Sequence, residues 1–166
     1  MICFVGTTFA PVHLREAARL SGLTLTNQIH IADLVFISED TPTQDGKRDL
    51  IRIRNLVASV ILETKSSAVL VLTSQVPPGF TRSLGLNLYH MAETLRVKDA
   101  AHRAMYPEQF IVGCEHPDKP LPQVFLDYLH HFQCPVFQMT WEEAEFAKIA
   151  INMTLASQVE NATRLS

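Results

Sequence analysis

The chain of 166 residues has 47% hydrophobic residues, 14 Lys and Arg, 17 Asp and Glu, and a formal net charge of −3. This composition can bury one sizeable core, so we expect a single globular domain. The basic residues are scattered, no apolar run reaches the roughly 18 residues of a membrane span, and the first residues lack a signal-peptide pattern. We therefore expect a cytoplasmic protein with no nucleic-acid and no membrane partner.

The first half of the chain alternates short apolar runs with segments of helical periodicity. Its predicted elements are a strand over 2–5, a helix over 11–20, a strand stub over 23–26, a strand over 32–38, a helix over 49–62 and a strand over 68–72. The run at 32–38 is continuously apolar, as in a strand covered on both faces of a parallel sheet. The segments 40–43 and 74–79 are predicted loops, because prolines and a glycine interrupt them.

The second half continues the same alternation. Its predicted elements are a strand over 86–91, a helix over 97–105, a strand over 109–112, a helix over 124–132, a strand over 136–139 and a final helix from Thr140. Glu142 and Glu143 stand where a helix N-terminus favours negative charge. This order predicts an α/β fold, a mainly parallel sheet flanked by helices and ending in a C-terminal helix.

The turn after the first strand is one candidate binding site. A glycine turn followed by a helix presents free backbone N–H groups and a helix dipole to a phosphate. Gly6 fits this role, but the G-x-G-x-x-G fingerprint requires glycine where Thr8 and Pro11 stand. The loops 40–43 and 74–77 are a second candidate, because ligands of open α/β sheets gather at the ends of such strands. An ordinary βα turn and two plain strand-ending turns remain the alternatives.

The C-terminal helix is the third candidate. Glu145, Lys148 and Asn152 are three and then four residues apart and share one helix face. A Lys beside an Asn could hold an oxyanion or position a water, whereas a solvated helix face is the alternative. The seven His and three Cys show no metal-ligand or CxxC spacing, so no metal site is expected, and the cysteines are interpreted as buried or inert thiols.

Taken in order, several segments resemble the UDP-glucose/GDP-mannose (nucleotide-sugar) dehydrogenase family. The segment ADLVFISEDTPT at 32–43 is similar to the stretch that ends in the family's V-x-T-P loop, and VLVLTSQVPPG at 69–79 to its S-T-V-P-x-G loop. AETLR at 92–96 and YPEQFIVG at 106–113 resemble P-E-F-L-x-E-G and N-P-x-R-x-V-x-G. EEAEFAKIAINMTLASQVEN at 142–161 resembles the A-E-x-x-K-x-x-x-N helix, the most specific of these motifs.

The resemblance implies an NAD-dependent enzyme that oxidises the C6 alcohol of a UDP- or GDP-linked sugar to a carboxylate through a cysteine thioester. It implies catalytic roles for three residues: Glu93 in acid/base work, Lys148 in stabilising negative charge and Asn152 in positioning substrate or water. It implies that the cofactor is bound by Gly6, Thr8, Thr41, Pro42 and Gln75. Residues 1–139 would form a Rossmann-like NAD-binding domain, shortened after residue 26, and 140–166 the start of the central connecting helix.

The chain also departs from the family pattern. Gln75 stands at the Thr of S-T-V-P, Val97 and Lys98 replace the final Glu and Gly of P-E-F-L-x-E-G, and no acid for the adenosine ribose follows the strand stub. No Cys lies in the family's G-G-x-C-x-P-K-D context, so the chain is expected to be truncated and inactive alone. The alternative is a non-catalytic interaction module, or a split subunit, that forms a homodimer or binds a partner chain through Ile151, Leu155 and Val159 of the C-terminal helix.

Overall fold

The computed structural model describes residues 1–165, with side-chain surroundings for all of these except 44, 159 and 161–165. Its main feature is a six-stranded sheet in the order β1-β2-β5-β6-β7-β8. The strands are β1 (Ile2–Val5), β2 (Leu34–Ile37), β5 (Val69–Leu72), β6 (Leu88–Met91), β7 (Phe110–Cys114) and β8 (Val136–Thr140). The first four run parallel, β7 is antiparallel to β6, and β8 is parallel to β7.

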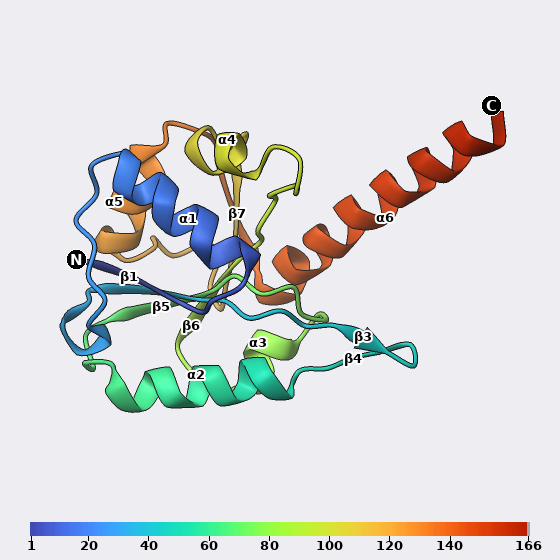
Figure 1. Cartoon of the computed structure of the whole chain (residues 1–166). Coiled ribbons are helices and arrows are strands. Elements are labelled where there is room, and N and C mark those ends of the chain that lie inside the picture. Colours follow the sequence, from blue (N-terminus) through green and yellow to red (C-terminus); the bar gives the residue numbers. More distant parts are fainter. Residues whose placement is uncertain (166) are drawn as a thin grey trace.

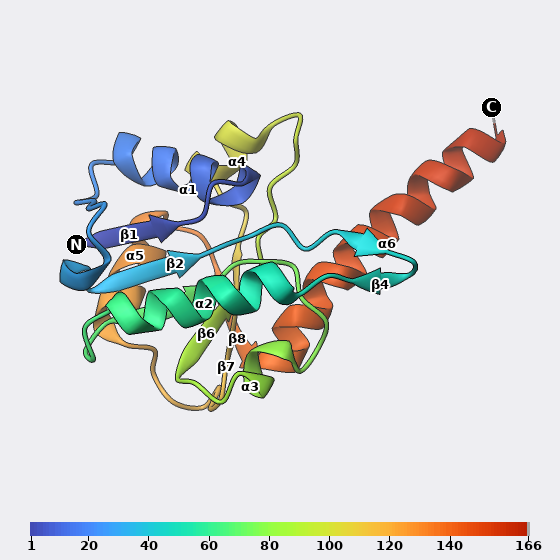
Figure 2. The same ribbon diagram turned by 60° about the horizontal axis from the view of Figure 1, so that its bottom comes forward.

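Helices cover both faces of this sheet, as Figures 1 and 2 show. They are α1 (Phe9–Leu20), α2 (Ile51–Glu63), α3 (Phe80–Ser83), α4 (Ala100–Met105), α5 (Gln123–His131) and α6 (Trp141–Leu165), with a 3₁₀ turn at Ile29–Ile31. Helices α1, α4 and α5 lie on one face, and α2 and α3 on the other. The layers and the connection order make this a Rossmann-like fold, so the predicted α/β fold with a mainly parallel sheet is confirmed.

Two apolar cores hold the layers together. Alternate residues of each strand point to opposite faces, so Phe36 packs with Tyr128 of α5 on one side while Val35 packs with Ile53 of α2 on the other. Both strand residues are at most 1% exposed, which explains why the run at 32–38 is apolar without alternation. None of the helices in the described part of the chain is both long and apolar enough to cross a bilayer.

The predicted strand stub at 23–26 is present as a single bridge. Leu25 pairs with Ile2 in parallel, through bonds from the Ile2 N–H to the Thr24 carbonyl oxygen and from the Thr26 N–H to the Ile2 carbonyl oxygen (both 2.9 Å). Ile2 begins β1, so the bridge lies at the edge of the sheet opposite Gly6. The chain then turns into the 3₁₀ helix without extending towards Gly6.

Three elements differ from the sequence prediction. The loop after β2 continues into a hairpin of β3 (Thr43–Gln44) and β4 (Lys47–Arg48), which projects beyond the sheet (Figure 2). The short helix α3 follows directly on the loop 74–79. Helix α4 begins at Ala100 instead of Val97, and the Val97 side chain is 87% exposed and contributes nothing to the core.

Gly6 is required by the close approach of β1 to β2. Its φ is +122°, and a Cβ atom there would lie 1.9 Å from the Ser38 carbonyl oxygen. We therefore expect Gly6→Ala to lower the free energy of unfolding by about 3 kcal/mol or more, measured by urea denaturation.

Gly22→Ala is the matched control for this substitution. Gly22 also has a positive φ (+81°), but a Cβ there would meet nothing within 4 Å. Its cost is expected to stay at about 1–2 kcal/mol, from backbone conformation alone. Equal losses in the two variants would contradict the steric explanation.

Candidate functional site

The parallel strands β1, β2, β5 and β6 bring the candidate loops to one edge of the sheet. There the chain leaves β1 at Gly6, β2 at Ser38, β5 at Thr73 and β6 at Ala92. A cavity of about 500 Å³ opens at this edge, and we call it the edge cleft. Its walls include Ala10, Ser38, Thr41, Arg48, Gln75 and Glu93.

The turn from β1 into α1 forms one end of this edge. Thr8 precedes the helix without a side-chain capping bond, and its buried Oγ1 has no hydrogen-bond partner among the described residues. The first N–H groups of a helix have no partner within the helix, so they can bind an anion. Pro11 lies in the first turn of α1 and is buried, and it lacks one of these N–H groups.

Hydrogen bonds join the loops after β2 and β5. The Thr41 hydroxyl donates to the Gln75 carbonyl oxygen (2.5 Å), and the Arg48 guanidinium donates to the carbonyl and hydroxyl oxygens of Thr41 (2.8 and 3.0 Å). Pro42 follows Thr41 and also lines the edge cleft. Four of the predicted cofactor-binding residues thus lie along one edge: Gly6, Thr41, Pro42 and Gln75, with Thr8 at the adjoining helix start.

Two cationic residues of this cleft were missed in the sequence. Arg48 is placed by the hairpin, where it pairs with Thr43, and Arg52 lines the cleft from α2. The Asp45-Gly46 dipeptide was the available signal, because this pair favours a two-residue hairpin turn with two positive φ angles. The observed values are +50° and +73°.

A buried ion pair joins α6 to the end of β6. Lys148 Nζ lies 3.6 Å from Glu93 Oε2, with the two side chains 10% and 15% exposed. The other Glu93 carboxylate oxygen accepts a hydrogen bond from the Leu95 N–H. Burial raises the pKa of Glu93, and the Lys148 charge and these hydrogen bonds only partly oppose this.

A second link between α6 and the sheet edge lies nearby. The Asn152 side-chain amide donates to Gln75 Oε1 (3.2 Å). Lys148 and Asn152 line a further hollow of about 210 Å³, which we call the helix hollow, together with Arg96 and Arg103. The Glu93–Lys148 and Gln75–Asn152 pairs therefore separate the edge cleft from the helix hollow.

The third residue of the α6 triplet has a structural position. Glu145 is 1% exposed, and its carboxylate accepts hydrogen bonds from the Gly79 N–H (2.5 Å) and the Thr81 N–H (2.8 Å) at the start of α3. Lys148 is also buried. The alternative of a wholly solvated helix face is therefore wrong for these two residues, although Asn152 is exposed.

Helix α6 lies directly on β7 because Gly113 leaves room for it. A Cβ atom on Gly113 would lie 2.8 Å from the Ala144 Cβ and 3.0 Å from the Trp141 Cα. This close contact and the hydrogen bonds of Glu145 fix the position of α6 along β7, and so determine where Lys148 and Asn152 contact the sheet edge.

The thiols and imidazoles lie outside this arrangement. Cys3 and Cys114 are buried, Cys134 is partly buried, and burial raises the pKa of all three thiols. His90 is fully enclosed in β6, and burial lowers its pKa to about 4. Among the described residues, no three His, Cys, Asp or Glu side chains are grouped so that they could hold a metal ion.

No protein-family model matches the chain, but curated proteins and solved structures do. A UDP-glucose 6-dehydrogenase of Rickettsia conorii is 25% identical over 120 residues, which are 64% of this chain and 28% of that protein. The chain thus spans less than a third of the length of this relative.

Solved structures share the fold at lower identity. GDP-mannose dehydrogenase from Pseudomonas aeruginosa superposes with a TM-score of 0.65 at 23% identity, over 79% of this chain and 34% of that one. UDP-N-acetyl-mannosamine dehydrogenase from Staphylococcus aureus gives a TM-score of 0.73 at 14% identity, over 99% and 53% of the two chains. A prephenate dehydrogenase from A. aeolicus in complex with NAD+ gives 0.59 at 12% identity, over 96% and 69%.

The Glu93–Lys148 contact predicts a specific titration behaviour. We expect the Glu93 carboxyl to titrate above its ordinary pKa of 4.5, because burial dominates its surroundings. Lys148→Met should raise this pKa further, because it removes the charge that favours the carboxylate. Carbon-detected NMR of the Glu93 side chain measures both values.

Lys98→Met is the control, since Lys98 is exposed and lines neither the edge cleft nor the helix hollow. It should leave the Glu93 titration unchanged. A Glu93 pKa at or below 4.5 in the unmodified chain would show that pairing, not burial, controls this carboxyl.

Proposed function

We propose that this chain is the dinucleotide-binding part of a nucleotide-sugar dehydrogenase, the family to which its sequence is similar and whose Rossmann-like fold it has. One observation carries the proposal: Glu93, Lys148 and Asn152 meet the Thr41–Gln75 loops at a single sheet edge. The proposed ligands are NAD and a UDP- or GDP-linked sugar. Both are solutes of the cytoplasm, which is the location we propose.

The turn and the edge cleft suit the pyrophosphate and nicotinamide side of NAD. The buried Thr8 hydroxyl lacks a partner among the described residues, beside the free N–H groups at the start of α1. Thr41 and Gln75 border the cleft, and Arg48 and Arg52 add positive charge to a lining that also contains the carboxylates of Glu39 and Asp40. These residues would hold the cofactor, which when bound accepts the hydride removed from the sugar alcohol.

The part of the fold that would hold the adenosine half of NAD is incomplete. In dinucleotide-binding folds an acidic residue at the end of the second strand bonds the ribose. Here the second strand is the single bridge of Leu25 to Ile2, at the opposite edge from Gly6. The bridge is too far from Gly6 to contribute a ligand for the adenosine ribose, so we propose no ribose-binding residue.

The residues between the two cavities suit an alcohol oxidation. The Lys148 ammonium would stabilise the negative charge that develops on the sugar oxygen. Glu93, whose pKa is raised by burial, would exchange protons with that oxygen or with water closer to neutral pH than an ordinary carboxyl. Asn152 would position the sugar or a water from its place in the helix hollow.

The second oxidation of this family needs a cysteine thiolate. Burial raises the pKa of Cys3, Cys114 and Cys134, which keeps these thiols protonated and poorly nucleophilic. None of them lines the edge cleft or the helix hollow. We therefore propose that the nucleophile comes from a segment outside these 166 residues.

Ligand titration of the purified chain tests the proposal. We expect saturable binding of NAD+ and of UDP-glucose or GDP-mannose in calorimetry. Thr41→Val should weaken NAD+ about three- to tenfold, because it removes the hydroxyl that joins the two cofactor loops. Thr24→Val is the control, since Thr24 is exposed beside Ile2 at the opposite sheet edge.

Each result of this titration is decisive. An absence of saturable binding by all three ligands would reduce the claim to the fold. Binding of a nucleotide sugar without NAD+ would overturn the cofactor assignment. Equal weakening in both threonine variants would remove Thr41 from the binding site.

A second candidate function is assembly through α6. The helix leaves the sheet after its first turns and projects away from the body (Figure 1), and the Met153 side chain is 65% exposed on it. Ile151 and Leu155 are only partly covered, and the side chain of Val159 lies outside the described part. In this proposal residues 140–166 begin a connecting helix that a second copy of the chain or a partner chain covers.

Sedimentation equilibrium tests this candidate. We expect concentration-dependent self-association of the unmodified chain that Leu155→Asp weakens, because a charge would be buried in the contact. Ser157→Asp is the control, because Ser157 is exposed on the opposite face of α6 and the variant introduces the same charge there. A strict monomer at high concentration would contradict self-association.

A further inference from the structure

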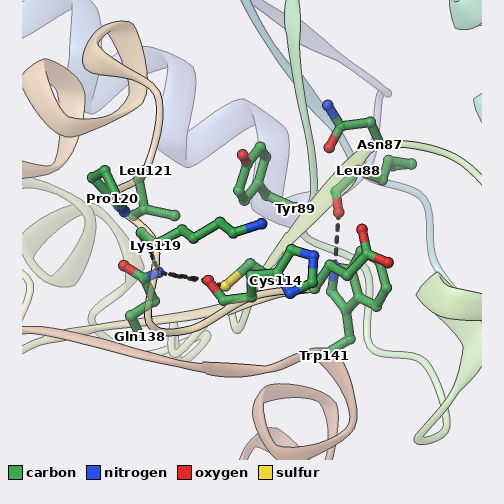
Figure 3. Close-up of a pocket in the computed structure, with 11 residues that line it drawn as sticks. Asn87, Leu88, Tyr89, Cys114, Lys119, Pro120, Leu121, Gln138 and Trp141 are labelled. Atoms are coloured by element: carbon green, nitrogen blue, oxygen red, sulfur yellow. Dashed lines mark hydrogen bonds between the residues drawn. The ribbon is translucent and has the colours of Figure 1, made fainter.

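A separate small pocket lies at the sheet edge opposite the edge cleft. Strand β6 starts there and the antiparallel β7 and β8 end there, so their termini surround a cavity of about 140 Å³. We call it the rear pocket, and Figure 3 shows its residues. Its polar and aromatic lining includes Asn87, Tyr89, Cys114, Lys119, Gln138 and Trp141.

Hydrogen bonds hold the walls of the rear pocket in place. Gln138 Nε2 donates to the carbonyl oxygen of Lys119 (2.6 Å), which fastens the loop before α5 to β8. The Trp141 indole N–H donates to the Leu88 carbonyl oxygen (2.7 Å), which fastens the start of α6 to β6. A pocket whose walls are already positioned loses little conformational freedom when a ligand binds.

Three of the hydrogen-bond donors that line the rear pocket have no partner among the described residues. Figure 3 shows the Lys119 side chain extending across the pocket between Tyr89 and Cys114, with Asn87 at the far side. Within the described part of the chain, the Lys119 ammonium, the Tyr89 hydroxyl and the Asn87 amide have no hydrogen-bond or ion-pair partner. Burial raises the pKa of Tyr89, so its hydroxyl stays a donor at neutral pH.

Among the described residues, no carboxylate forms an ion pair with the Lys119 ammonium. The Glu115 carboxylate also lines the rear pocket, and its charge acts on Arg82, which bonds the Glu142 carboxylate (2.6 Å). The rear pocket thus has one unpaired cation and two neutral donors, beside the Glu115 carboxylate and the aromatic walls of Tyr89 and Trp141. Lys119 and Asn87 are exposed to solvent at its mouth. Oxyanions are the complementary ligands for such a group.

We propose that the rear pocket binds a small organic oxyanion, whose carboxylate or phosphate group is held by Lys119, Asn87 and Tyr89. Its volume of about 140 Å³ is below the range of nucleotide and drug-sized sites, so the ligand is a compact acid instead of a nucleotide. The pocket shares no residue with the edge cleft, so this proposal stands independently of the proposed function. Trp141 begins the helix that carries Lys148, which connects the two sites through one rigid element.

The single tryptophan of the chain reports on this pocket directly. We expect inorganic phosphate or acetate, titrated against chloride at equal ionic strength, to change Trp141 fluorescence with saturation. Comparing the two anions separates a phosphate from a carboxylate preference. Lys119→Met should weaken the binding about tenfold or more, because it removes the charged donor.

Two further variants make the test decisive. Lys98→Met removes an exposed lysine that does not line the rear pocket, and it should leave the titration unchanged. Asn87→Asp should also weaken binding, because it places a negative charge against the anion at an exposed position. No saturable change with either anion, or equal binding by the unmodified and Lys119→Met chains, would overturn the proposal.

Discussion

The attachment of α6 to the sheet through the buried Glu145 carboxylate is the contact on which the candidate site depends. Two backbone N–H groups at the start of α3 donate to this carboxylate, and each hydrogen bond to a charged group contributes about 1.5–3 kcal/mol. These bonds only partly offset the burial that raises the pKa of Glu145. Lys148 and Asn152 follow three and seven residues later, so they lie on the same helix face as Glu145. Glu145 and the close packing at Gly113 therefore decide where these two side chains meet the sheet.

The Glu93–Lys148 pair is better suited to chemistry than to stability. Removing two charges from water costs several kcal/mol per ion, and their attraction returns this only when the geometry is good. Here the two atoms are 3.6 Å apart, and burial still raises the pKa of Glu93 despite the nearby ammonium. A carboxyl in this condition exchanges protons more readily near neutral pH. Because burial raises the folded-state pKa of Glu93, the contribution of this carboxyl to the free energy of unfolding is largest at low pH. It falls as the pH rises through that pKa.

The shortened second strand pairs with the start of β1 but does not reach the end of β1 at Gly6. The bridge between Leu25 and Ile2 is enough to complete the start of β1, because it satisfies both backbone groups of Ile2. It leaves the Gly6 edge without the strand that normally carries the adenosine ribose acid. The edge cleft instead contains Arg48 and Arg52, which come from the hairpin and from α2. These two cations stand beside the Glu39, Asp40 and Glu93 carboxylates of the same cleft.

The sequence alone determined the alternation of strands and helices, because apolar periodicity is a local property of the chain. It also determined the spacing of Glu145, Lys148 and Asn152, since helix geometry alone places them on one face. It did not determine that Glu145 and Lys148 are buried, because burial depends on the distant β7 and α3 packing against that face. The contacts of Glu93 with Lys148 and of Gln75 with Asn152 join residues 55 and 77 positions apart. Only the tertiary structure decided them, because no local pattern records which loops meet at the edge of a folded sheet.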